Sequence, residues 1–184
     1  MAKYLAKTKE GRCIFCEIIA GKLQIPGIFW EDKKFMAWLP MWPNTQGFTA
    51  IAPKKHFGSD VLSMPDKDLA EFILATKHVS KILLKHFDDV GRVGLIMEGM
   101  GIDHAHIKLI PMHGTGYLKK GIWKQIHSEN DHYFDSYEGF ISSNDGPRVD
   151  DNVIYAQAEK LRKYTGYKSK FQKNCFQPLK PESI

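Results

Sequence analysis

The segment from Asp103 to Pro111 carries the side chains best suited to chemistry in this sequence. It places His104, His106 and Lys108 at every second position, with apolar residues between them. Because successive side chains of a strand point to opposite faces, we expect these three to line one face of a strand while their neighbours enter the core. The alternative is a solvated strand face that happens to carry two histidines.

The imidazole of His106 is a candidate nucleophile, because its ordinary pKa of ~6.5 leaves it largely neutral near pH 7. A nucleophilic histidine needs its far ring nitrogen held as N–H by a hydrogen bond. The ammonium of Lys108 would lower the pKa of His106 and could neutralise a phosphate oxygen. These groups favour attack on phosphorus over acyl transfer, for which an oxyanion hole and an acid partner would be expected.

A second candidate site is the Cys-x-x-Cys formed by Cys13 and Cys16. Two thiolates at this spacing suit tetrahedral zinc, which needs two further ligands. The chain has no second Cys-x-x-Cys, and His56 and His104 are the best placed histidines. The alternatives are a thioredoxin-like dithiol, which would require a βαβ context that this sequence lacks, and a pair of ordinary buried cysteines.

Several short apolar segments predict the strands that must position these residues. Five strands are expected at residues 28–30, 35–39, 47–52, 92–97 and 105–110. A long amphipathic helix is expected behind a capping box, with Ser63 as N-cap and Asp66 as the acid, because apolar residues recur at helical spacing from Leu69 to Phe87. Shorter helices are expected at 16–20 and 153–162. The pattern predicts an α+β sheet with helices on one face.

The composition fits one globular domain of 184 residues, since 43% of the chain is hydrophobic and 12% aromatic. A disordered chain would be poorer in both. No apolar run approaches the ~20 residues of a membrane span, and residues 1–10 lack the apolar core of a secretory signal. Three cysteines exclude a closed disulfide framework and favour a reducing compartment. We therefore expect a cytoplasmic protein.

Charge alone leaves the partner open. Lys and Arg number 26 against 21 Asp and Glu, a formal net charge of +5. This excess is compatible with nucleic acid, a small phosphorylated ligand or simple solubility. Many of the basic residues fall within 160–180, where a solvated tail and a polyanion-binding surface are the alternatives. The turn-rich segment 142–147 is expected to be a surface turn, with shaping of a phosphate pocket as the alternative.

Taken together, these motifs resemble the histidine-triad (HIT) superfamily. Its hallmark His-φ-His-φ-His-φ-φ is matched by residues 104–110, except that Lys108 takes the place of the third histidine. Residues 13–22, 30–32 and 47–56 match the N-terminal signature of the family in order. The resemblance covers roughly residues 13–114. It divides the chain into a basic N-terminal segment (1–12), a HIT domain (13–114) and a C-terminal extension (115–184).

The resemblance implies a HIT-like α+β fold, an antiparallel sheet of about five strands with one long amphipathic helix packed on it and a C-terminal helical extension. It implies a homodimer that binds nucleotides and transfers or hydrolyses nucleotidyl groups through a nucleotidyl-histidine. The middle histidine, His106, would be the nucleophile, with His104 and Lys108 as the other catalytic residues. Some relatives bind structural zinc, and their pattern maps to Cys13, Cys16, His56 and His104. The base pocket would comprise Ile14, Phe15, Ile18, Trp38 and Met41.

Other positions depart from the family pattern. Phe48 stands where many members have histidine, Pro40 where the ribose-binding aspartate is usual, and Met97 with the turn 98–101 where an asparagine and a longer polar loop hold phosphate. The leading hypothesis is a nucleotide phosphohydrolase or nucleotidyl transferase acting on a phosphoanhydride or related bond, such as that of a dinucleoside polyphosphate or a nucleotide phosphoramidate. The alternatives are a nucleotide-binding module without catalysis and a nucleic-acid-processing protein.

Overall fold

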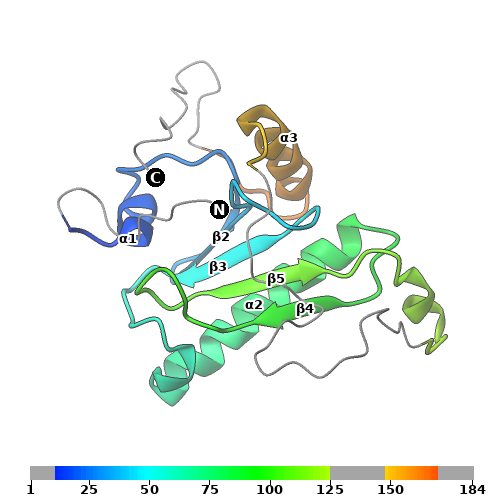
Figure 1. Ribbon diagram of the computed structural model, residues 1–184, viewed down its shortest axis with the longest axis horizontal. Coiled ribbons are helices and arrows are strands. Elements are labelled where there is room, and N and C mark those ends of the chain that lie inside the picture. The colour runs from blue at the N-terminus through cyan, green and yellow to red at the C-terminus, as the bar shows by residue number, and fades with distance from the viewer. Residues whose placement is uncertain (1–10, 125–147, 170–184) are drawn as a thin grey trace, which may run out of the picture.

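A five-stranded antiparallel sheet forms the centre of the computed structural model, which describes residues 11–124 and 148–169 (Figure 1). In chain order the strands are β1 (Ile28–Glu31), β2 (Phe35–Trp38), β3 (Thr49–Pro53), β4 (Val93–Ile96) and β5 (Ile107–Pro111). In space their order is β1-β2-β3-β5-β4, and every neighbouring pair is antiparallel. The predicted α+β class and strand number are confirmed.

Two apolar clusters cover opposite faces of this sheet. The main core packs α2 (Asp66–His86) against one face, where Phe72 and Leu83 meet Ile51 and Ile107. On the other face α1 (Ile14–Ile19) forms a smaller cluster. That cluster contains Phe15, Ile18, Met36, Trp38, Ala50 and Ala52. The expectation of helices on one face was therefore wrong, because the alternating β2 and β3 residues are apolar on both sides.

The long helix α2 is confirmed, but its predicted capping box is wrong. Ser63 belongs to the short 3-10 helix η1 (Val61–Ser63), and its hydroxyl donates to the Asp60 carboxylate. The N-cap of α2 is Pro65, which makes no side-chain cap. The reason is that the residue before a proline is driven into an extended conformation, so Met64 separates η1 from α2.

The ends of α2 are stabilised in other ways. Two aspartates in its first turn, Asp66 and Asp68, complement the positive end of the helix dipole. At the other end the Lys119 ammonium, from the 3-10 helix η2 (Gly116–Lys120), donates to the carbonyl oxygens of Leu84 at 3.0 Å and Phe87 at 2.9 Å.

The C-terminal helix α3 (Asp151–Arg162) packs beside the outer strand β1. The buried Arg162 guanidinium donates to the Ile28 carbonyl from Nε at 2.8 Å and to the Pro26 carbonyl from Nη2 at 3.0 Å. The Thr165 hydroxyl donates to the Phe29 carbonyl at 2.9 Å. These side chains cover the edge of β1, whose carbonyls would otherwise be open to another strand.

Two expected strands, β3 and β5, begin two residues later than predicted. β3 starts at Thr49, because the preceding Gly47 has a φ of +77°, a turn conformation that keeps it out of the strand. Gly47 also lies against the Phe87 ring. β5 starts at Ile107, because the His104 N–H bonds to the Ile102 carbonyl and the Ala105 N–H to the Phe57 carbonyl.

Some expectations concern parts of the chain beyond this description. The segment 142–147 and the basic residues after 169 lie outside the described residues. Within the described ranges, none of the helices combines the length and apolar character that crossing a bilayer would require.

Candidate active site and metal centre

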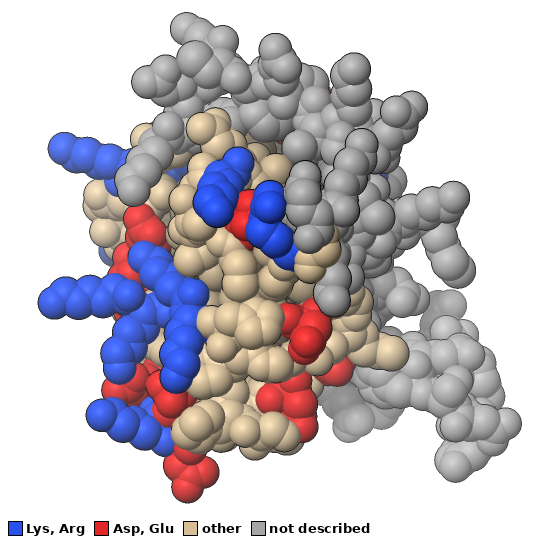
Figure 2. Space-filling model, turned by 90° about the vertical axis from the view of Figure 1, so that its left-hand side faces the viewer, with Lys and Arg blue, Asp and Glu red and all other residues tan. Residues whose placement is uncertain are grey.

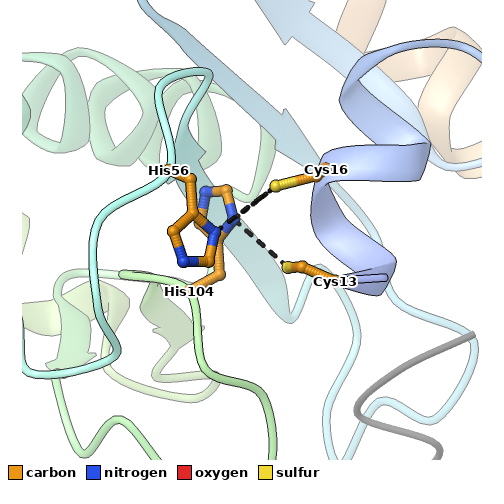
Figure 3. Close-up of side chains that lie close together, drawn as sticks. All are labelled: Cys13, Cys16, His56 and His104. Atoms are coloured by element: carbon orange, nitrogen blue, oxygen red, sulfur yellow. Dashed lines mark hydrogen bonds between the residues drawn. The ribbon is translucent and has the colours of Figure 1, made fainter. Parts of the chain in front are cut away.

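The four predicted metal ligands come together from three separate parts of the chain (Figure 3). Cys13 is the N-cap of α1 and Cys16 lies in its first turn, so the helical spacing of three residues puts both sulfurs on one side. His56 follows β3 and His104 precedes β5. Since β3 and β5 are paired neighbours, their ends bring the two imidazoles together.

The distances in this group fit a tetrahedral zinc ion. The ligand atoms all lie within 4.8 Å of one another. His104 Nδ1 is 3.5 Å from both cysteine sulfurs, and His56 Nδ1 is 3.4 Å from Cys16 Sγ. Tetrahedral zinc with ordinary Zn–S and Zn–N bonds would separate sulfur and nitrogen by about 3.6 Å. The donor set therefore fits zinc, and two histidines beside the thiols do not fit a thioredoxin-like dithiol.

Burial and hydrogen bonding prepare His104 as a neutral ligand. Its side chain is fully buried, and its Nε2–H donates to the Pro53 carbonyl at 2.9 Å, which leaves the Nδ1 lone pair facing the sulfurs. Burial also lowers the pKa of His104. Burial raises the pKa of the Cys16 thiol to about 11, and the neighbouring Cys13 adds to the shift. A bound cation would reverse this balance, because metal coordination deprotonates thiols.

His106 has the hydrogen bond that a nucleophilic histidine requires. Its Nδ1 lies 2.7 Å from the backbone carbonyl of His104, which can only accept, so Nδ1 carries the proton and Nε2 holds the lone pair. The side chain is only 4% exposed. Burial is the main reason that the pKa of His106 lies below its ordinary value, and the Lys108 charge adds to it. The neighbouring Lys108 predicts this direction from the sequence, whereas burial, the larger cause, becomes visible only in the structure.

The solvated-face alternative for this segment is wrong, since both His104 and His106 are buried. His106 and Lys108 lie on the face of the sheet opposite the main core, where Ile107 and Leu109 are buried.

Lys108 does not stand alone, because its ammonium forms an ion pair with Glu98. The two side chains are 16% and 20% exposed. Sequence reasoning treated residue 98 only as part of a turn and missed it. The contact depends on the pairing of β4 with β5, in which Ile96 lies opposite Lys108 and Glu98 follows Ile96 by two residues, so no local sequence pattern reveals it.

The structure gathers four of the five residues predicted for the base pocket. Phe15, Ile18 and Trp38 belong to the α1 cluster, and Ile14 packs against it. The Phe15 ring meets that of Trp38 edge-on at 5.0 Å and that of His106 at 5.4 Å. Met41, in contrast, lies in the main core cluster and is not brought together with the other four.

Charges are mixed in sign on the face of the molecule that Figure 2 shows, which is the left-hand side of Figure 1. Acidic side chains lie among the lysine and arginine side chains of this face. Several basic residues of the described surface are ion-paired: Arg12 with Glu17, Lys34 with Glu71, and Lys54 with Glu31.

Comparison with known sequences places this arrangement in a family. No protein-family model matches the chain. An uncharacterized HIT-like protein of Methanocaldococcus jannaschii is 33% identical over 113 residues, which are 59% of this chain and 85% of the relative. An adenosine 5'-monophosphoramidase of Candida albicans is 30% identical over 107 residues, 54% of this chain and 69% of the relative.

Solved structures agree in fold. A hypothetical histidine triad nucleotide-binding protein of Sulfolobus tokodaii has a TM-score of 0.59 at 26% identity, covering 82% of this chain and 90% of its own. A zinc-bound histidine triad family protein of Mycobacterium smegmatis has a TM-score of 0.56 at 18% identity, covering 82% and 91%. The fold and the site thus define a histidine-triad protein. The chain belongs to the HIT family, and its Cys13, Cys16, His56 and His104 group fits the zinc-binding type.

Proposed function

We propose that the protein is a nucleotide hydrolase or nucleotidyl transferase that works through a covalent nucleotidyl-His106. The observation that carries this proposal is the 2.7 Å hydrogen bond from His106 Nδ1–H to the His104 carbonyl. It presents Nε2 as an unprotonated nitrogen, which is the form that can attack phosphorus. The Candida albicans relative, named as a phosphoramidase, supports chemistry at a nucleotide phosphorus.

In the first step the His106 Nε2 lone pair attacks the phosphorus of a bound nucleotide. The bond between phosphorus and the leaving group breaks, and the leaving group departs with its electron pair. In the second step water or another acceptor takes the nucleotidyl group and restores His106. The Lys108 ammonium offsets phosphate charge, and the nucleoside base lies against the cluster that contains Phe15 and Trp38.

Zinc would be held by Cys13, Cys16, His56 and His104 and would contribute to folding. Four protein ligands close the coordination shell, which is typical of structural zinc and leaves no position for substrate. His104 has two parts in this arrangement. Its side chain faces the two sulfurs, while its backbone carbonyl holds His106. We therefore infer that the metal group fixes the orientation of the nucleophile.

Two further features complete the proposal. Within the part of the chain that the structure describes, β4 is an outer strand with an exposed Leu95, and its pairing with a second copy would form a homodimer. A reducing cytoplasmic compartment would keep Cys13 and Cys16 reduced and able to bind a metal ion.

Replacement of His106 by Asn tests the proposal. Wild-type protein incubated with adenosine 5'-phosphoramidate and quenched without acid is expected to show an adenylylated peptide containing residue 106 by mass spectrometry. The His106→Asn variant should lose the adduct and the turnover, while His78→Asn, an exposed position on α2, should keep both. Wild-type turnover retained by His106→Asn would refute the proposal.

A second function, nucleotide binding without turnover, is favoured by the burial of His106 and by the neutralisation of Lys108 by Glu98. Calorimetry that shows nucleotide binding, combined with no product from a broad panel of nucleotides, would support it. Any turnover that depends on His106 would exclude it.

A further inference from the structure

We propose that Glu98 makes the site selective for nucleotides whose leaving group is neutral or cationic, as in a phosphoramidate, over those whose leaving group is a polyphosphate. This inference rests on the proposed function, because it concerns the group that His106 would displace. It assigns a role in specificity to a carboxylate beside the predicted catalytic residues.

The position of Glu98 follows from the pairing of β4 with β5. In that ladder Leu95 lies opposite Leu109 and Ile96 opposite Lys108. Glu98 follows the end of β4 by two residues, and its carboxylate contacts the Lys108 ammonium. Met97 packs against the main core, whereas the contact with Lys108 places the Glu98 carboxylate on the other face, which His106 shares.

The ion pair places Glu98 within the electrostatic surroundings of the nucleophile. Glu98 contacts the Lys108 ammonium directly, and both charges act on the His106 imidazole with opposite sign. Both side chains are largely shielded from water, which weakens screening by salt. Glu98 therefore cancels much of the positive charge that Lys108 alone would offer to a phosphate.

This charge balance distinguishes two kinds of substrate. A polyphosphate leaving group carries several negative charges, and a carboxylate beside the reacting phosphorus repels it. With a phosphoramidate, the His106 Nε2–P bond forms and the substrate P–N bond breaks. The departing nitrogen keeps the electron pair of that bond and takes two protons from the solvent, the first giving ammonia and the second giving ammonium. The resulting ammonium is a favourable partner for the Glu98 carboxylate.

The test compares kcat/KM for adenosine 5'-phosphoramidate and for diadenosine tetraphosphate in the wild-type protein and in Glu98→Gln. The wild type is expected to prefer the phosphoramidate. Glu98→Gln should shift the ratio toward the tetraphosphate by about tenfold or more, the order expected when one nearby unit charge is removed. Glu98→Asp, which keeps the charge, should keep the wild-type direction of preference.

A matched control is Glu31→Gln. Glu31 pairs with Lys54 at 2.8 Å, and these side chains are 25% and 28% exposed, but the pair lies at the β1 edge of the sheet. This variant should leave the ratio unchanged. A wild-type preference for the tetraphosphate, or a ratio that Glu98→Gln leaves unchanged, would overturn the inference while the proposed function stands. If the His106→Asn variant turned over both substrates at the wild-type rate, the proposed function itself would be wrong.

Discussion

Replacing Arg162 with methionine is expected to destabilise the protein by about 3–6 kcal/mol, because two carbonyl oxygens would lose a charged donor worth ~1.5–3 kcal/mol each. Those oxygens belong to Pro26 and Ile28, at distances of 3.0 and 2.8 Å from the guanidinium. Methionine retains most of the apolar length of the side chain, so the loss reports mainly on the hydrogen bonds. The guanidinium also lies near the Tyr155 and Tyr167 rings, at 5.3 and 5.9 Å from their centroids.

Urea denaturation followed by circular dichroism measures this loss. With an m-value of ~2 kcal/mol/M, the midpoint should fall by about 2 M, and the melting temperature should fall by about 10 °C. Arg148→Met is the matched control. Arg148 pairs with Asp151 at 2.9 Å, but its side chain is 39% exposed against 4% for Arg162, so its replacement should cost less. An Arg162→Met protein within 1 kcal/mol of the wild type would show that the docking of α3 does not depend on these bonds.

Three further changes have expected outcomes. Cys13→Ser should lower the bound zinc from about one equivalent, measured by elemental analysis, and lower the melting temperature, because structural zinc contributes to folding. Phe72→Ala should cost about 3–5 kcal/mol in urea unfolding, since Phe72 is fully buried in the main core. Asp89→Asn should reduce the loss of stability on acidification. The Gly114 N–H, followed by His113, lowers the pKa of Asp89, so its contribution is present above the unfolded pKa of ~3.9 and is lost as the pH falls through the folded pKa.

Each of these changes has a result that contradicts its reasoning. The proposed structural zinc would be wrong if wild-type protein contained no zinc and Cys13→Ser left the melting temperature unchanged. Ile73→Ala, at an exposed position of α2, is the control for Phe72→Ala, and equal losses in the two would deny the packing described for this helix. If the acid unfolding curves of Asp89→Asn and the wild type coincided below pH ~4, the hydrogen bonds of Asp89 would not be a source of the pH dependence of stability.

Much of the fold follows from local patterns in the sequence. The helical spacing from Leu69 to Phe87 predicts α2, and the ligand group follows from a Cys-x-x-Cys together with two histidines that flank neighbouring strands. Such patterns work because periodicity and ligand spacing are local properties of the chain. The antiparallel order of the sheet came from the family resemblance instead.

Other features depend on contacts between distant residues, which no local pattern contains. The prediction of Ser63 as the N-cap of α2 was wrong because Pro65 holds Met64 in an extended conformation. The pairing of Glu98 with Lys108 depends on how β4 aligns with β5, and the separation of Met41 from the base-pocket residues depends on which face of the sheet the chain turns toward. The sequence gives the residue types at these positions, but it does not show which residues lie next to them in space.

The way α3 covers β1 has a consequence for how far assembly can proceed. A sheet with two open edges can add copies of itself without limit, as in a fibre. Within the described ranges, side chains of Arg162 and Thr165 occupy the β1 edge, and β4 is the opposite outer strand. In the proposed pairing through β4 both copies would use the same surface, so a twofold axis would satisfy both and growth would end at two.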